Sequence, residues 1–371
     1  MKTILLVEDD PAIQRGIREN LRREQFRVLV ERDGTQGLSK ALRELPDLVI
    51  LDVMLPGLNG FEVCANLKNR GFSAPIFMLT ALGDERSKLK GLGIGADDYL
   101  PKPFSVEELM LRVRNALDRT ERTMGKAKAF EQELRKAREI QRESLPKRPP
   151  RIRGLDLWGT MTPATHIGGD YFDFVRLGSG NLAVVVADVC GKGMPAALHV
   201  QKMQGIVHAS RAHVETASQI LLQLQEHLGP SLGTASFVTV AAAVVDQSRR
   251  TMDVAGAGHP PVLLRRGTTI ESLKAEGMWV GPTIGRSFAE MLQPVTIPYQ
   301  PGDTFVFYTD GVLESMNPTQ EEFGMARWQN ALLQAEGTSR SLVQAGFKEL
   351  RNFAGVEPQS DDITIVAVGI Q

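Results

Sequence analysis

Cysteine is scarce in this chain, which has only Cys64 and Cys190 among its 371 residues. The two lie far apart in the sequence, and neither belongs to a C-x-x-C pair. A disulfide framework or a structural zinc site is therefore not expected, because both need closely patterned cysteines. The scarcity fits a reducing compartment, and we expect a cytoplasmic protein.

Long apolar runs and an excess of one charge are also missing. No run approaches the roughly 18 apolar residues of a membrane-spanning helix. Met1-Lys2-Thr3 leads straight into a strand-like run without a signal-peptide pattern. The formal net charge is -1, which argues against a strongly nucleic-acid-binding surface. No helix-turn-helix pattern or basic recognition helix follows Lys102. We expect neither a membrane nor a nucleic acid as a partner.

Residues 1–119 alternate between short apolar runs and stretches with apolar residues at helical spacing, such as Ile13, Ile17 and Leu21. The apolar runs are 3–7, 27–30, 47–51, 75–79 and 97–100. Five strand–helix units of this kind predict a doubly wound, flavodoxin-like α/β domain with five parallel strands. Ligands of such sheets bind at the carboxyl ends of the strands.

Residues 120–147 are rich in Glu, Lys, Arg and Gln and contain no proline before Pro146. A thin apolar stripe recurs there at gaps of three, four or seven residues, through Leu117, Met124, Ala127, Phe130, Leu134, Ala137 and Ile140. The stripe predicts a helical linker. It is either a solvated connector or a dimerising, signal-transmitting coiled coil, and Gly125 weakens the second interpretation.

Residues 148–371 read as a second domain of apolar strands around a few helices. The predicted strands are 155–161, 171–176, 182–187, 236–245, 251–255, 261–265, 304–309 and 363–369. The predicted helices are 194–213, 216–228 and 339–353. Strands in runs followed by helices predict an α+β fold, with two packed sheets and helices outside them.

Single carboxylates stand at the ends of several of these runs. Asp52 ends one apolar run of the first domain, and Glu8 and Asp9 follow another. Three acids so close would repel one another unless a divalent cation neutralised them. A phosphoryl group on Asp52 would also need a charge clamp, for which Lys102 offers a cation and Thr80 a hydroxyl. Each residue alone is more often structural, but together they predict a phosphoryl site.

A second set of acids lies in the second domain. Asp170 follows two glycines, Asp188 ends an apolar run, Asp310 lies in a Thr-Asp-Gly sequence and Asp361 precedes the last apolar run. Any one of them is commonly only a turn residue. The chemistry that needs only acids is metal-assisted hydrolysis at phosphorus. No serine, cysteine or histidine has a recognisable nucleophile setting, so the set predicts a hydrolytic metal site.

The first domain resembles the receiver domain of two-component response regulators. The matching motifs are Leu6-Val7-Glu8-Asp9-Asp10, Leu51-Asp52-Val53-Met54-Leu55-Pro56, Leu79-Thr80-Ala81, Gly95-Ala96-Asp97-Asp98-Tyr99 and Lys102-Pro103-Phe104. The resemblance implies that a sensor histidine kinase phosphorylates Asp52. It implies a magnesium ion held by Asp9, Asp52 and the Met54 carbonyl, with Glu8 acting through water. It also implies that Thr80 and Tyr99 form a switch pair.

The second domain resembles the metal-dependent serine/threonine phosphatases of the protein phosphatase 2C type, and most of all their bacterial branch that controls sporulation and stress sigma factors. The matching motifs are Gly168-Gly169-Asp170, residues 187–193, residues 257–261, residues 309–312, residues 361–364, and residues 137–141 with Leu145-Pro146. The resemblance implies two manganese or magnesium ions. Their ligands would be Asp170, Asp188, the Val189 carbonyl, Asp310 and Asp361, with Asp173 a weaker candidate.

The chain departs from that family at two points. Cys190 stands where serine is frequent, which predicts that peroxide inactivates the site. The arginine or histidine that binds substrate phosphate in eukaryotic relatives has no identifiable counterpart. Lys192 is either a phosphate ligand or a solvated turn residue, and His259, in a turn rich in Gly and Pro, is read as structural.

The leading hypothesis is a response regulator whose output is a phosphatase. Its substrate would be a phosphoserine or phosphothreonine on an anti-sigma-factor antagonist, as the resemblance implies, and the linker helix would carry the signal. A homodimer through the receiver or the linker is a further hypothesis. The alternatives are a catalytically silent adaptor and, because of Gly168-Gly169-Asp170, a cyclic-dinucleotide synthase.

Overall fold

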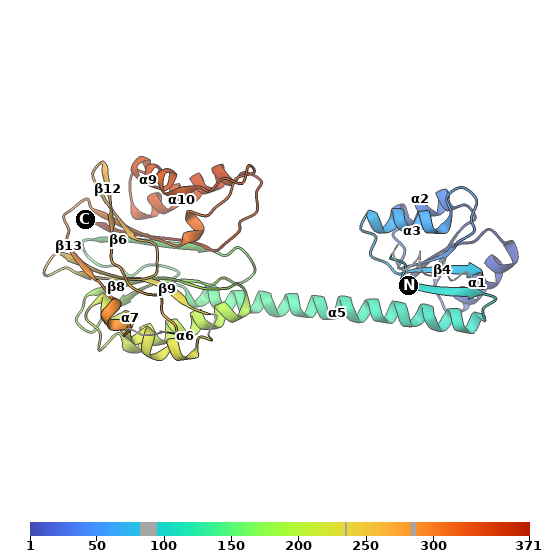
Figure 1. The fold of residues 1–371 in the computed structure, drawn as a ribbon, viewed down its shortest axis with the longest axis horizontal. Helices are drawn as coiled ribbons and strands as arrows, with labels where there is room; N and C mark the ends of the chain where they lie inside the picture. The colour runs from blue at the N-terminus through green and yellow to red at the C-terminus, as the bar shows by residue number, and fades with distance from the viewer. Residues whose placement is uncertain (82–94, 234–235, 283–286) are drawn as a thin grey trace. The chain divides into compact units, whose positions relative to one another are not determined.

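The computed structural model describes residues 1–81, 95–233, 236–282 and 287–371 (Figure 1). The chain divides into two compact units, Met1–Glu131 and Gln132–Gln371. Across these described ranges, no helix has both the length and the apolar character needed to cross a membrane.

The first unit contains a five-stranded parallel sheet in the order β2-β1-β3-β4-β5. The strands are β1 (Thr3–Val7), β2 (Arg27–Glu31), β3 (Leu48–Asp52), β4 (Ile76–Ala81) and β5 (Asp98–Lys102). The helices are α1 (Pro11–Arg23), α2 (Gly34–Glu44), α3 (Gly60–Asn69) and α5 (Val106–Ser144). This confirms the predicted doubly wound fold, and the helical stretch expected before β5 falls mainly on residues 82–94, outside the described residues.

The alternation of side chains along the strands produces two cores in this unit. Ile4 and Leu6 of β1 pack on one face with residues of α1 and α5. Leu5 and Val7 pack on the other face with residues of α2 and α3. The sheet is therefore covered on both faces, as a parallel sheet must be, and its carboxyl edge stays open for a site.

Helix α5 is a single helix of 39 residues that crosses the division between the two units. The helical linker was predicted over 120–147, and the observed helix begins earlier, within the first unit. Leu109, Val113 and Leu117 are buried against the receiver sheet. Met124 and Phe130 are 60% and 61% exposed. The helical linker is confirmed, and its pairing as a coiled coil stays a prediction.

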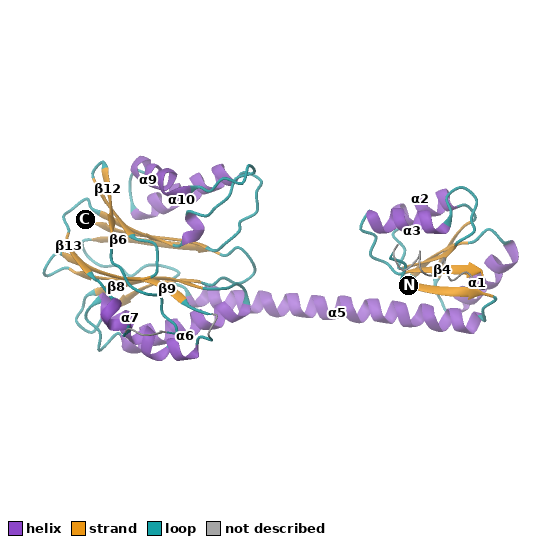
Figure 2. Ribbon diagram, viewed as in Figure 1, coloured by secondary structure: helices purple, strands orange, loops and turns teal. Residues whose placement is uncertain are grey.

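The second unit is built on two antiparallel five-stranded sheets, drawn as two orange layers in Figure 2. The first sheet has the order β13-β10-β9-β8-β7, and the second has the order β12-β11-β14-β15-β6. The strands are β6 (Leu155–Thr162), β7 (Asp170–Arg176), β8 (Leu182–Val189), β9 (Val238–Asp246), β10 (Thr251–Ala257), β11 (Val262–Arg266), β12 (Thr269–Leu273), β13 (Val295–Pro298), β14 (Thr304–Tyr308) and β15 (Ile363–Ile370). The predicted pair of packed sheets is confirmed.

Helices cover the outer faces of both sheets (Figure 1). Helices α6 (Met194–Ser210) and α7 (Ala217–His227) pack on the first sheet, and α9 (Gly324–Gln334) and α10 (Ser339–Ala354) pack on the second. The shorter helices are η1 (Gly229–Ser231), α8 (Phe288–Met291) and η2 (Asp310–Val312). Strand β7 shows how the sequence builds these layers: Phe172 and Phe174 face the second sheet, whereas Tyr171 and Val175 face α6 and α7.

Candidate functional site

The receiver acids meet at the carboxyl edge of the parallel sheet. Glu8 and Asp9 follow β1, and Asp52 is the last residue of the neighbouring strand β3. One ligand atom from each of the three lies within 4.8 Å of the others. The fold therefore brings together the three acids that the sequence proposed as the surroundings of a magnesium ion, with the oxygen chemistry that this ion prefers.

Lys102, at the end of β5, lies against two of these acids. Its Nζ donates to Glu8 Oε2 at 2.8 Å and to Asp52 Oδ2 at 2.7 Å. Burial raises the pKa of Glu8 to about 7, although the hydrogen bond from Lys102 opposes the rise. Burial alone would lower the pKa of Lys102, but its bonds to Asp52 and Glu8 outweigh burial and raise it. The ammonium group of Lys102 is thus placed to stabilise negative charge at Asp52.

The remaining receiver candidates, Met54, Thr80 and Tyr99, make fewer contacts with the acid cluster than Lys102 does. The Met54 backbone N–H donates to Asp52 Oδ1 at 3.3 Å. Thr80 is buried near the end of β4. The Tyr99 hydroxyl is buried and has no hydrogen-bond partner among the described residues, and burial raises the pKa of Tyr99 to about 12. No hydrogen bond joins Thr80 and Tyr99 in the described part of the chain, so their pairing as a switch stays a prediction.

In the second unit, Asp170 links the two sheets. It begins β7, is 1% exposed and pairs in register with Asp188 of β8. Its Oδ2 accepts hydrogen bonds from Thr309 Oγ1 at 2.8 Å, directly after β14, and from Thr364 Oγ1 at 2.6 Å, in β15 of the opposite sheet. Burial, and then the charge of Asp188, raise the pKa of Asp170 well above its ordinary value. Asp170 is therefore an acid fixed in place by two hydroxyls.

The other acids form what we call the acid rim, defined as Asp188, Asp310, Glu314 and Asp361. Burial raises the pKa of Asp188 most, and the charges of nearby acids add to the rise, which brings it to about 7; in order of effect these acids are Asp310, Asp361, Asp362 and Glu314. Within the described ranges, no three ligand atoms of the acid rim lie within 4.8 Å of one another, unlike those of the receiver cluster. The acid rim is electrostatically coupled but more open.

Lys192, in the loop after β8, contacts the segment that carries Asp361. Its Nζ donates to the Ser360 carbonyl at 2.6 Å and lies 3.4 Å from Asp361 Oδ2, and its side chain is 52% exposed. Its charge also opposes the rise in the pKa of Asp310 and Glu314. Lys192 is thus a partly solvated cation at the acid rim, rather than a turn residue remote from it.

Comparison with known proteins identifies both units. The family model for Stage II sporulation protein E (SpoIIE) matches residues 178–371, and that for the response regulator receiver domain matches residues 4–114. The chain belongs to the SpoIIE family. It carries an N-terminal receiver domain fused to a SpoIIE-type protein phosphatase 2C domain, which confirms both resemblances.

Solved structures share the fold of the second unit. The SiaA-PP2C domain of Pseudomonas aeruginosa aligns with a TM-score of 0.57 at 24% identity, covering 66% of this chain and 98% of that domain. The RsbU and RsbW domains of Rv1364c from Mycobacterium tuberculosis align with a TM-score of 0.52 at 22% identity, covering 62% and 63%. At these identities the likeness shows the fold alone.

Two curated relatives match about a third of this chain. The Bacillus subtilis alkaline phosphatase synthesis transcriptional regulatory protein PhoP is 47% identical over 120 residues, which is 32% of this chain and 50% of that protein. The Synechocystis DNA-binding dual master transcriptional regulator RpaA is 45% identical over 133 residues, which is 35% of this chain and 55% of that protein. The chain spans about half the length of these curated relatives.

Asp173 and His259 are the two weaker candidates of the SpoIIE-type domain. Asp173 lies on the face of β7 away from Asp170, where it accepts from the Tyr171 hydroxyl at 3.0 Å and lies 2.7 Å from His208 Nε2. His259 Nδ1 lies 2.9 Å from Thr239 Oγ1, and burial lowers the pKa of His259 to about 3. The fold therefore does not bring Asp173 to the acid rim, and His259 is held as a neutral ring.

The site also contains residues that the sequence reading did not single out for it. Asp362 is 7% exposed and accepts from the backbone N–H groups of Ala164 at 2.7 Å and Gly169. A Cβ on Gly168 would lie 2.8 Å from Asp362 Oδ2, so any other residue there would displace this carboxylate. The two adjacent acids therefore have different roles. Asp361 belongs to the acid rim, whereas Asp362 holds the loop before Asp170 by hydrogen bonds.

The linker helix contacts this same loop. Gln141 of α5 is 5% exposed, and its Nε2 donates to the Gly168 carbonyl at 2.7 Å while its Oε1 accepts from the Gly168 N–H at 3.1 Å. Gly168 and Gly169 lead directly into Asp170. The end of α5 is therefore hydrogen-bonded to the loop that places Asp170.

Proposed function

We propose that this SpoIIE-family protein is a response regulator whose SpoIIE-type domain hydrolyses phosphoserine or phosphothreonine on a regulatory protein under the control of Asp52. A sensor histidine kinase would phosphorylate Asp52. The substrate would be an anti-sigma-factor antagonist or a similar phosphoprotein. The observation that carries the hydrolytic part is the meeting of Asp170 and the acid rim at one edge of the two sheets.

The residues present fit divalent cations. All the side-chain donors are carboxylates, which suit manganese and magnesium alike. Burial and repulsion by neighbouring carboxylates raise the pKa of Asp188 to about 7. A bound cation would offset this repulsion and stabilise the ionised carboxylate. We propose Asp170, Asp188, Asp310, Asp361 and the Val189 carbonyl as ligands of two such ions. When bound, the ions would supply an activated water and stabilise charge at phosphorus.

The chain's own side chains would orient that chemistry. Thr309 and Thr364 hold one oxygen of Asp170, which leaves its other oxygen for a ligand. Lys192 would bind a phosphate oxygen of the substrate, because its ammonium group is partly solvated and lies at the acid rim. In the receiver, Asp52, Asp9, the Met54 carbonyl and Glu8 would surround one magnesium ion.

The route of control that we propose runs through α5, which begins in the receiver domain and ends at the Gly168 loop. Phosphorylation of Asp52 would change the receiver around Thr80, Tyr99 and the start of α5. The hydrogen bonds of Gln141 would pass the change to Asp170. The family match supports the phosphatase over the cyclic-dinucleotide synthase.

Phosphate release from a phosphoserine protein, with and without manganese, tests the hydrolytic part. The wild type should release phosphate only with manganese, and Asp170→Ala should release none. Equal release by both proteins would contradict the proposed site. Manganese binding without any release would favour the adaptor.

A further inference from the structure

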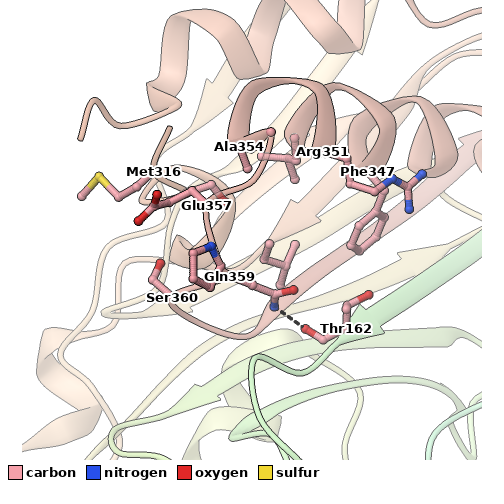
Figure 3. A pocket seen from close by; sticks show the side chains of 13 residues that line it. Thr162, Met316, Phe347, Arg351, Ala354, Glu357, Gln359 and Ser360 are labelled. Atoms are coloured by element: carbon pink, nitrogen blue, oxygen red, sulfur yellow. Dashed lines mark hydrogen bonds between the residues drawn. The ribbon is translucent and has the colours of Figure 1, made fainter. Parts of the chain in front are cut away.

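A pocket of about 280 Å³, whose lining side chains Figure 3 shows, includes Ser315 and Ser360, the chain neighbours of two acid-rim residues. One wall is α10, which contributes Phe347, Leu350 and Arg351, and the opposite wall is the loop 357–360. Ile363 of β15 and Met316 also line it, so much of the lining is apolar. Its volume is just below the roughly 300–1,000 Å³ of pockets for small molecules, and it suits one large side chain.

The pocket and the acid rim share two short segments of backbone. Ser315, which lines the pocket, directly follows Glu314, and Ser360, which also lines it, directly precedes Asp361. Neighbouring Cα atoms are about 3.8 Å apart. A peptide with its phosphorylated residue at the acid rim therefore reaches the pocket with a side chain only a few residues away.

Hydrogen bonds hold the shared loop against the pocket. The Gln359 Nε2 donates to the Thr162 carbonyl at 2.8 Å, the bond drawn in Figure 3, and to the Asp361 carbonyl at 2.6 Å. The Ser315 Oγ donates to the Gly311 carbonyl at 2.7 Å. A ligand in the pocket would thus contact residues that are bonded directly to the acid-bearing segments.

The pocket also carries a free cation. Arg351 is exposed on α10, and none of the ion pairs within the described residues includes it. The other charged residue of the pocket, Glu357, accepts a hydrogen bond from Gln320 Nε2 at 3.2 Å. The pocket therefore carries one charge of each sign, and Arg351 is the group with which an acidic side chain of a ligand would pair.

We propose that this pocket binds the phosphoprotein substrate itself, by taking a large apolar side chain that lies next to an acidic residue paired with Arg351. The pocket is then a specificity site, distinct from the residues that act on phosphate. This inference rests on the proposed function, because the acid rim must hold the phosphorylated residue.

The test uses the full chain and nine-residue phosphoserine peptides. One leucine is moved through each position from four before to four after the phosphoserine, in an otherwise alanine peptide with one glutamate beside the leucine. Fluorescence anisotropy measures the affinity of each peptide for Asp170→Asn, which binds without turnover. Hydrolysis is measured separately, as turnover of p-nitrophenyl phosphate by proteins that keep Asp170.

A leucine at one offset should tighten binding about tenfold over the all-alanine peptide, equivalent to about 1.4 kcal/mol. Ala354→Phe, which fills the pocket, and Arg351→Glu should each remove this gain and leave p-nitrophenyl phosphate turnover unchanged. Lys348→Glu, on an exposed position of the same helix that does not line the pocket, should keep the gain.

Two results would overturn the inference: no offset gives a gain, or the gain survives in both pocket variants. Loss of p-nitrophenyl phosphate turnover in Ala354→Phe would mark a folding defect. The effect of Arg351→Glu on the leucine gain would then decide whether the pocket binds the peptide. If the wild type turns over no p-nitrophenyl phosphate but the leucine gain follows the pocket variants, the proposed hydrolysis fails while the docking site stands.

Discussion

The contact between Gln141 and Gly168 gives the sharpest test of how α5 acts on the phosphatase domain. The substitution Gln141→Ala removes one donor and one acceptor from a buried position. The substitution leaves the buried N–H and C=O of Gly168 without partners, because the Gln141 side chain binds both groups. The loop 168–170 would then lose the bonds that fix it to the helix.

The magnitude follows from these two orphaned groups. Each buried polar group left without a partner costs about 1–3 kcal/mol, so the pair costs at least about 2 kcal/mol. If this energy holds Asp170 in its ligand position, the apparent affinity for manganese falls about 30-fold, since about 1.4 kcal/mol corresponds to a factor of ten. Saturating manganese should restore most of the turnover, because no catalytic carboxylate has been removed.

The assay is a manganese titration of p-nitrophenyl phosphate turnover, with thermal unfolding measured on the same samples. Glu139→Ala is the matched control, because Glu139 lies two residues away on the same helix and is exposed. The control should keep the wild-type manganese dependence. The reasoning is refuted if Gln141→Ala reaches half-maximal turnover at the same manganese concentration as the control.

Three further predictions follow from the two sites. Asp170→Asn should abolish manganese-dependent turnover, whereas Asp173→Asn should retain it, because Asp173 faces α6; equal loss in both would contradict the assignment. The pKa of Asp188 is about 7 in the folded chain, against an ordinary value of 3.8. Between these two pH values the folded chain binds more protons than the unfolded chain, so the free energy of unfolding falls as pH rises through this window. Manganese should therefore raise the melting temperature more at about pH 8 than at about pH 6, and an equal rise at both would contradict this. Asp52→Asn should block phosphorylation by acetyl phosphate on a phosphate-affinity gel, while the exposed Asp118→Asn should not; a phosphorylated Asp52→Asn band would place the acceptor elsewhere.

The strands that position both sites could be predicted from the sequence, because each is a buried apolar run with an acid at one end. Strands β3 and β8 are examples, with Asp52 and Asp188 at or near their ends. The edge strands β12 and β13 were not predicted. Their residues alternate between exposed and half-buried, with only Leu273 fully buried, and Pro298 ends β13, so neither is the apolar run of a central strand.

The positioning residues were harder to predict because their partners are distant in sequence. Thr309 and Thr364 bond to Asp170 across 139 and 194 residues, and Gln141 reaches Gly168 across 27. A threonine or a glutamine has no local pattern that reveals such a partner. Asp361 and Asp362 are neighbours with the same side chain, and only the course of the loop before β15 separates their roles.

The most direct test of the central claim compares phosphate release before and after a phosphoryl mimic is placed on Asp52. Beryllofluoride would be added to the wild type and to Asp52→Asn in magnesium and manganese, with a phosphoserine protein as substrate. The rate of phosphate release should change severalfold in the wild type and stay constant in Asp52→Asn. An identical rate in the wild type with and without beryllofluoride, once its binding to the receiver is verified, would contradict control of the phosphatase by Asp52.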